Sequence, residues 1–460
     1  EALRSRIVNA TTEDDLYYGL TLLSNARRDS HLYLTPVPDG LKGPSLTEAR
    51  APIQILPDYS DMHTPSFFVS GLDQKHLDAS ELPGVDRVAI GDLIVSVNGL
   101  SIPEFIETFR AWTRHSAPQG LYWRLARDIP IRAPATAPWM YREALELELE
   151  DAQGQRYSAT LPYLEPNTVS IELGEAELYP GFSVVMERFN FNVLRPDDGR
   201  RVVLLQWLDF EYELIQDVMD LIAYSEAQDL LDHTLVIDVT ASSGGSRGAY
   251  AIQRLVDRPF RTTFGNLRIS DAAIEMIEEW AVEPDRDVPE IFGLNESRSW
   301  LHEWAQTRAK QDVEAALAYT RATPFKLAHL PHTSEDGILM PAPVHYTGPI
   351  AIIGGPNGGS HLDQFVSMFA DNDLAFTIGM PTGGYSNTWE AEETLYFPGT
   401  TQPVVQFMWN VGHTLRPNGE ILEGNAVQPE VYVPLTRENF RTYHRDLLEA
   451  ALDRLSRPVS

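Results

Sequence analysis

The residue with the clearest chemical potential follows a glycine-rich turn. The apolar run 350–353 leads into the turn 354–359, and Ser360 stands where a helix is expected to begin. A turn of this kind lifts a side chain to the carboxyl edge of a parallel sheet, where open α/β folds bind ligands. The N–H groups that open the helix point to the same place and can stabilise an oxyanion. Ser is also a favoured N-cap residue, so this segment alone leaves nucleophile and cap both open.

A second turn has a related composition. The segment 235–248, LVIDVTASSGGSRG, is an apolar run that ends in Gly and Ser before a helix. The main-chain N–H groups of Gly244 and Gly245 are candidate oxyanion donors. Tight turns between strands and helices also need glycine for backbone reasons, so the pattern alone does not establish an oxyanion site.

A serine nucleophile needs a base, and imidazole is the usual one. His31 follows Asp29 and Ser30, so a carboxylate and a hydroxyl stand beside it and can fix one tautomer. A histidine at a helix end can equally be only a polar residue. Asp61-Met62-His63 repeats the spacing, so His63 competes for the role.

The elements expected to position these residues fall into two parts of the chain that differ in their pattern of apolar residues. A helix is expected over 12–28, with Thr12 as its N-cap. Short strands are expected within 66–98, a helix from 102, and further strands over 120–163 with a hairpin at DAQGQ. We therefore expect an N-terminal helical segment over 1–46 and a β-rich domain over 47–165.

From 166 the pattern changes to apolar runs that alternate with helices. The order β-α-β-α predicts an α/β fold with a mostly parallel sheet over 166–460. Residues 259–345 interrupt this order with charged, helical sequence around Trp280, Trp300 and Trp304, and we expect a helical insertion or lid there.

Composition excludes several classes of function. The chain of 460 residues has 66 acidic and 36 basic residues and a net charge of −30, which disfavours nucleic acid and anionic membranes as partners. No apolar run approaches the roughly 20 residues of a membrane span. There are no cysteines, and neither His329 with His332 nor the stretch 371–373 completes a metal site, so no metal or other cofactor is expected.

Four segments together resemble the tail-specific, or C-terminal processing, serine peptidase family, which has a crotonase-like α/β core and usually a PDZ domain. The glycine turns before Ser360 and at 242–245 are similar to the core motifs, and PTGG at 381–384 follows the next strand. VAIGDLIVSVNG at 88–99 resembles a PDZ signature, and RPNGEILEGNAVQPEVYV at 416–433 resembles the terminal motif. These segments occur in the family's order over most of the chain.

The resemblance implies roles for individual residues. Ser360 takes the nucleophile position, and the N–H groups of Gly244 and His361 take the oxyanion positions. Many members use a lysine in the turn after the next strand, but Tyr385 stands there, and no lysine follows Lys326. A serine–lysine dyad at that position is therefore impossible.

The lysine-free branch, similar to the tricorn core protease, uses histidine as the base. In that branch a serine precedes the histidine and a glutamate of the terminal motif orients the pair, and Ser30, His31 and Glu423 match these positions. We prefer His31 to His63 because it follows the early helix, as the family's histidine does, whereas His63 falls just before the PDZ-like strands.

The resemblance thus implies a serine endopeptidase or carboxyl-terminal processing peptidase that acts on a peptide or protein substrate, with a PDZ-like domain that captures peptide. The turn at 242–245 and the Pro429-Glu430 pair depart from the family pattern. Two alternatives therefore remain: an inactive relative that binds peptides or acts as a scaffold, and an acyl-ester hydrolase that uses the same serine. Because the chain begins at Glu1, we expect a removed export signal and a periplasmic or extracellular location.

Overall fold

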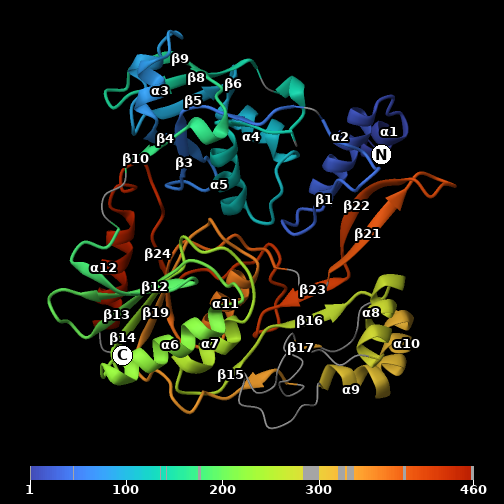
Figure 1. The fold of residues 1–460 in the computed structure, drawn as a ribbon, viewed down its shortest axis with the longest axis vertical. Coiled ribbons are helices and arrows are strands. Elements are labelled where there is room, and N and C mark those ends of the chain that lie inside the picture. Colours follow the sequence, from blue (N-terminus) through green and yellow to red (C-terminus); the bar gives the residue numbers. More distant parts are fainter. Residues whose placement is uncertain are drawn as a thin grey trace. The chain divides into compact units, whose positions relative to one another are not determined.

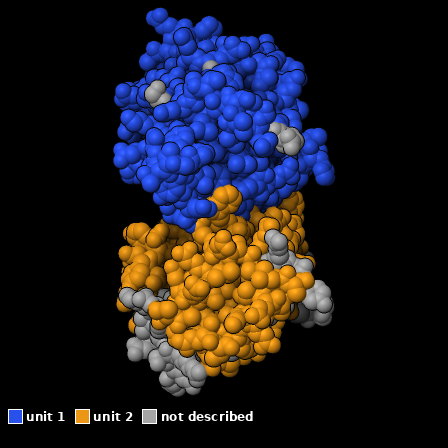
Figure 2. All heavy atoms as spheres, turned by 90° about the vertical axis from the view of Figure 1, so that its right-hand side faces the viewer, with its two compact units in different colours: residues 1–178, 392–408, 434–444 blue, residues 179–391, 409–433, 445–460 orange. Residues whose placement is uncertain are grey.

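The chain divides into two compact units (Figures 1 and 2), and each is described by itself. Unit 1 comprises residues 1–178, 392–408 and 434–444, and unit 2 comprises 179–391, 409–433 and 445–460. Unit 1 therefore contains both segments expected before residue 166 and two later ones. The structure, a computed structural model, describes residues 2–44, 46–134, 136–140, 142–174, 178–282, 300–319, 327–328, 336–386 and 390–456.

The N-terminal part of unit 1 is helical, as the sequence predicts. The helix α2 begins where Thr12 accepts a hydrogen bond from the N–H of Asp15, which confirms the expected N-cap. Apolar residues of α2 and the following segment pack on β22, and β1 pairs with β22 antiparallel. The elements here are α1 (Ala2–Val8), α2 (Glu13–Asn25), β1 (Leu34–Thr35), β21 (Glu390–Tyr396) and β22 (Pro403–Asn410).

The β-rich part of unit 1 contains a seven-stranded sheet. Its path is β10-β4-β5-β8-β9, with β3 paired to β4 and β6 to β5. The expected hairpin is confirmed, because β8 and β9 pair antiparallel around DAQGQ. The strands are β3 (Ile53–Asp58), β4 (Ser66–Leu72), β5 (Leu93–Val97), β6 (Leu100–Ser101), β8 (Ala144–Glu150), β9 (Arg156–Pro162) and β10 (Glu172–Leu173), and a small separate sheet pairs β2 (Ala49–Arg50) with β7 (Ile131–Arg132).

The helices of this part include one that the sequence analysis missed. We expected strands from 120 onward, but α5 (Pro118–Asp128) is a helix. Pro118 takes the first helical position, where its missing N–H costs nothing, and Leu121 and Leu125 are buried at helical spacing. The other helices are α3 (Gln74–Asp78), α4 (Ile102–Arg110), η1 (Val85–Arg87), η2 (Pro138–Met140) and η3 (Pro166–Thr168).

Unit 2 is built on the predicted parallel sheet. Its strand order is β11-β12-β13-β14-β19-β20-β24, with parallel pairing from β13 to β24 and an antiparallel edge of β11 and β12. Apolar faces of α6, α7 and α11 pack on it in one buried core. The elements are β11 (Phe182–Glu187), β12 (Phe191–Pro196), β13 (Val202–Trp207), β14 (Thr234–Asp238), β19 (Ile350–Gly354), β20 (Phe376–Gly379), β24 (Val431–Tyr432), α6 (Leu214–Ala227), α7 (Gly248–Leu255), α11 (His361–Ala370) and α12 (Tyr443–Ser456).

The interruption at 259–345 is only partly helical. Trp304 lies in a small apolar core between α8 and α9, as expected for packing of an insertion. The segment also contains strands that the sequence analysis did not name, because β16 pairs with β17 and with β23 from beyond the insertion, and β15 pairs with β18. These elements are α8 (Asp271–Val282), α9 (Trp300–Thr307), α10 (Ala309–Tyr319), β15 (Phe260–Arg261), β16 (Phe264–Leu267), β17 (Leu327–Ala328), β18 (Ile338–Leu339) and β23 (Gly412–Leu415).

No helix in the described ranges is both long and apolar enough to cross a membrane.

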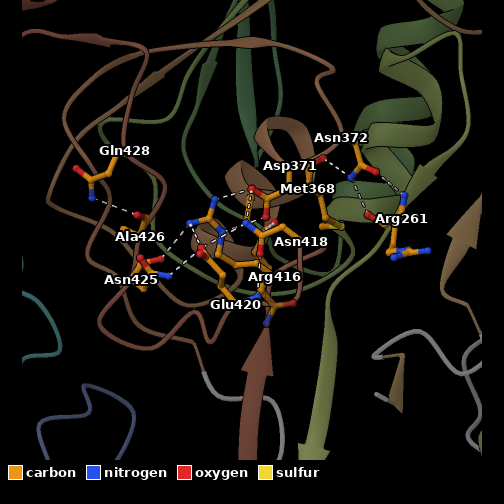
Figure 3. Close-up of polar contacts among 12 residues, drawn as sticks. Arg261, Met368, Asp371, Asn372, Arg416, Asn418, Glu420, Asn425, Ala426 and Gln428 are labelled. Carbon is orange, nitrogen blue, oxygen red and sulfur yellow. Dashed lines mark hydrogen bonds and ion pairs between the residues drawn. The ribbon is translucent and has the colours of Figure 1, made fainter. Parts of the chain in front are cut away.

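An ion pair joins the segment after β23 to the end of α11 (Figure 3). Arg416 donates from Nε to Asp371 at 3.0 Å and from a terminal nitrogen to the other carboxylate oxygen. Both side chains are at most 10% exposed, and Asn418 adds a further bond to Asp371. Asp371 thus lies at the polar end of α11, as its C-cap residue. The pair holds the start of the terminal motif against the end of α11.

We expect Arg416→Ala to destabilise the protein by about 3–5 kcal/mol, because it leaves the Asp371 carboxylate buried without its charged partner. Urea unfolding measures the change. The control is Arg156→Ala, which removes a 60% exposed arginine paired with Glu150 and is expected to cost less than about 1 kcal/mol. Equal effects of the two substitutions would contradict a buried structural role for Arg416.

Candidate active site

Ser360 sits at a strained corner between β19 and α11. Its backbone has φ 63° and ψ −130°, in the half of φ that residues with a side chain rarely adopt. It occupies the N-cap position of α11, but its hydroxyl makes no capping hydrogen bond. The capping interpretation therefore does not account for this serine. Strain of this kind persists only where the surroundings fix it, and it is concentrated at functional sites.

Gly244 packs directly against this corner. A Cβ atom placed on Gly244 would lie 2.4 Å from Cβ of Ser360 and 2.9 Å from its Oγ, so only glycine fits. Within the described part of the chain, the N–H groups of Gly244 and His361 donate to no other group. Two main-chain donors beside one hydroxyl are what an oxyanion hole requires.

The imidazole of His361 is occupied, although it is the histidine next to Ser360 in the chain. Its Nε2 accepts a hydrogen bond of 2.7 Å from the N–H of Gly248, and its ring meets the ring of Phe210 edge-on at 5.4 Å. Burial lowers the pKa of His361 to about 4, against a hydrogen bond with Gln364 that raises it. The ring is therefore neutral near pH 7 and its lone pair is engaged, so it cannot act as the base for Ser360.

The turn 382–385 is fixed over the corner by one buried carboxylate. Asp363 accepts hydrogen bonds from the Thr382 hydroxyl, from the N–H of Gly384 at 3.2 Å and from the N–H of Tyr385 at 3.0 Å. The carbonyl of Tyr385 in turn accepts the N–H of Ser360 at 2.6 Å. The residue that stands at the lysine position thus holds the serine through its main chain.

Glu423 joins the same assembly from the terminal motif. Its Oε2 accepts the N–H of Ser386 at 3.1 Å, and the N–H of Gly424 donates to the carbonyl of Gly384 at 2.7 Å. Glu423 is therefore anchored to the end of the turn that also holds Ser360. Unit 2 brings together four of the predicted site residues: Ser360, His361, Gly244 and Glu423.

The other two predicted residues, Ser30 and His31, lie in unit 1. Asp29 accepts the N–H of His31 at 2.9 Å, and the N–H of Ser30 donates to the Ser116 hydroxyl at 3.0 Å. The competing histidine has the same local geometry, because Asp61 accepts the N–H of His63 at 2.8 Å. His63 is exposed, whereas Ser30 is buried and His31 is half-buried.

Comparison with known proteins identifies the fold. No protein-family model matches the chain, and no curated protein matches it by sequence. Among solved structures it resembles mature CPAF, with a TM-score of 0.70 and 14% identity over 99% of this chain and 90% of that one. Mature CPAF complexed with lactacystin gives 0.68 and 14% over 99% and 91%. A mutant of CPAF gives 0.68 and 14% over 100% and 92%. The chain thus has the α/β fold of CPAF over nearly its whole length.

Some contributors to the site were missed in the sequence. Asp363 follows Ser360 by three residues, and its bonds to the turn 382–385 were not foreseen. Ser116, which holds Ser30, lies 86 residues from it in the chain, and no local pattern marks it. A signal for Asp363 did exist, because an acid in the first turn of a helix pairs with main-chain donors near the helix N-terminus.

We expect Gly244→Ala to destabilise the folded protein by about 1–3 kcal/mol, because the added methyl group overlaps the side chain of Ser360. Chemical unfolding measures the loss. Ser243→Ala is the matched control in the same turn, since its exposed side chain bonds to Asp209 and to the carbonyl of Gly244 and, among the described residues, makes no bond to Ser360. If Gly244→Ala were as stable as the control, the two turns would not be in contact.

The pKa of His361 makes stability depend on pH. Because its pKa is about 4 in the folded protein and near 6.5 when unfolded, the unfolded chain binds the proton first as pH falls. We expect stability to decrease between pH 6.5 and 4, with about 3 kcal/mol from this group. His361→Gln removes the titration and should flatten the curve. Unfolding free energies measured against pH for both proteins test this, and parallel curves would contradict it.

Proposed function

We propose that this chain is a serine peptidase of the tail-specific family, with Ser360 as its nucleophile. The observation that carries the proposal is the strained corner at Ser360, whose hydroxyl makes no capping bond. Gly244 packs against this corner, and among the residues that the structure describes its N–H donates to no other group. This arrangement serves acyl transfer, because it exposes a nucleophile beside donors for a developing oxyanion.

In the proposed mechanism His31 takes the proton from Ser360 as Oγ attacks the scissile carbonyl carbon. The N–H groups of Gly244 and His361 stabilise the oxyanion. The C–N bond then breaks, His31 gives its proton to the leaving amine, and an acyl-enzyme remains. Water then gives a proton to His31 and attacks the acyl carbon. The bond from that carbon to Ser360 Oγ breaks, His31 returns the proton to Oγ, and the new carboxylate leaves. Ser30 and Glu423 orient the imidazole.

The β-rich part of unit 1 is proposed to be PDZ-like and to capture an extended peptide by strand addition, with a free carboxylate held in its loop. Among the described residues β3 pairs with β4 alone, and β6, β9 and β10 also have one partner each, so β3 is one of the strands with an edge to offer. An exported location, periplasmic or extracellular, accompanies this proposal.

Labelling with a fluorophosphonate tests the nucleophile and its base. We expect the label on Ser360, and we expect His31→Ala to slow labelling at least about a hundredfold, because an unactivated hydroxyl is a weak nucleophile. His63→Ala is the control, since His63 shares the turn geometry of His31, and it should label at the parental rate. Peptide mapping of the labelled site measures both outcomes.

Three results would contradict the proposal in different ways. Loss of labelling in His63→Ala alone would identify His63 as the base. No labelling of the folded parent would favour the inactive relative, a peptide-binding or scaffold protein. Parallel assays on a peptide and on an activated ester separate the remaining class, because an acyl-ester hydrolase cleaves the ester and spares the unactivated amide.

A further inference from the structure

Unit 1 contains a cavity of about 350 Å³ beside the turn that carries His31. It lies between α2, the segment after α4, and α5. Residues on both sides of the turn line it, with Asn25 before His31 and Tyr33 after it. This volume is at the lower end of small-molecule sites, so it suits one side chain or one chain end.

Three arginines line the cavity: Arg114, Arg124 and Arg127. Asp128 is the one acid among the described lining residues. The chain as a whole carries a charge of −30, so a concentration of arginine in one cavity is a local reversal of sign. Such a reversal attracts anions to that place while the remaining surface repels them.

The pKa values of two neighbouring groups reflect both their burial and the nearby arginines. Burial lowers the pKa of His115, and Arg110, Arg28 and Arg124 lower it further despite a hydrogen bond to the carbonyl of Thr113. Burial also raises the pKa of Asp128, although the surrounding arginines act against it. Asp128 also accepts a hydrogen bond from Nε of Arg127 at 3.3 Å, so it offsets part of the positive charge of the three arginines.

The walls of the cavity strengthen these charges. The rings of Tyr17, Tyr33 and Trp112 line it, and the guanidinium of Arg114 lies 5.5 Å from the ring centroid of Tyr33. Aromatic rings along one side reduce the access of water to the guanidinium groups, so an anion there interacts more strongly with the arginines than it would on a flat surface.

The cavity is joined to the turn of His31 by one of its arginines. Arg114 donates to the carbonyl of Ser30 at 3.5 Å while its side chain lines the cavity. A group that binds Arg114 therefore lies next to the main chain that holds His31.

We propose that this arginine-lined cavity binds a carboxylate of a peptide and thereby selects substrates with an acidic group. A carboxylate matches the planar guanidinium in a two-point contact and fits the available volume. The site is separate from the edge of β3. Its assignment to a substrate rests on the proposed peptidase function, whereas the recognition of a carboxylate does not.

Calorimetric titration of the full chain carrying Ser360→Ala tests this binding without hydrolysis. The probes are three alanine-based hexapeptides: one with an internal glutamate and both ends blocked, its glutamine counterpart with both ends blocked, and the glutamine peptide with a free carboxyl end. We expect at least tenfold tighter binding for a carboxylate probe than for the blocked glutamine peptide. The first and third probes distinguish a side-chain carboxylate from a chain end.

Arg124→Gln in the same background should reduce binding of the preferred carboxylate probe at least tenfold, and raising the salt concentration should weaken it in the parent. Arg156→Gln is the matched control, an exposed arginine of unit 1 paired with Glu150, and should leave binding unchanged. If Arg124→Gln does not fold, Arg127→Gln takes its place, because the side chain of Arg127 is 63% exposed.

Equal binding of all three peptides, or unchanged binding in the arginine variant, would overturn the proposal. Failure of the proposed function is a separate result. A chain that prefers the carboxylate peptides but takes no fluorophosphonate label would keep the site and lose the peptidase.

Discussion

The arrangement around Ser360 depends on the carboxylate of Asp363. This side chain is 2% exposed, and a buried carboxylate is stable only when donors surround it. Its donors come from the turn 382–385, namely one hydroxyl and two main-chain N–H groups. Bonds between an ionised acceptor and N–H donors are about twice as strong as neutral ones. The position of the turn is therefore fixed by α11, the same helix whose first residue follows the serine.

The turns around Ser360 are also held together by main-chain hydrogen bonds and by close contacts at glycines. The N–H of Ser360 donates to the carbonyl of Tyr385, and the N–H of Gly383 donates to the carbonyl of Gly358. Both bonds are 2.6 Å long. A Cβ atom at Gly358 would lie 2.0 Å from the carbonyl oxygen of Ser242, and one at Gly359 would overlap the ring of Tyr385. These glycines are required by close approach and not by their own dihedral angles. Such packing is what holds Ser360 in its unfavourable φ.

The sequence predicts the parallel sheet well, because buried strands leave continuous apolar runs such as β14 and β19 that local reading detects. The sequence also contains a signal for α5, namely the helical spacing of Leu121 and Leu125. The prediction of strands from 120 was wrong there because the strand-like sequence that follows was given more weight than this spacing. The pairing of β16 with β23 is different in kind, since strands of four residues that join remote segments leave no local signal. The same holds for Ser116 and Ser30, which are joined by tertiary contact alone.

The two candidate histidines lie in turns with the same local motif, but the surrounding structure holds the two turns to different degrees. Both turns place an aspartate oxygen on the N–H of the histidine, at 2.9 Å for His31 and 2.8 Å for His63. The turn of His31 is further held by Ser116 and Arg114 at the preceding serine. A base that is already ordered loses less conformational entropy when it engages a nucleophile, and such prior ordering lowers the barrier to reaction. Exposed His63 has to lose more conformational entropy, so prior ordering supports the proposal of His31 as the base independently of its place in the chain.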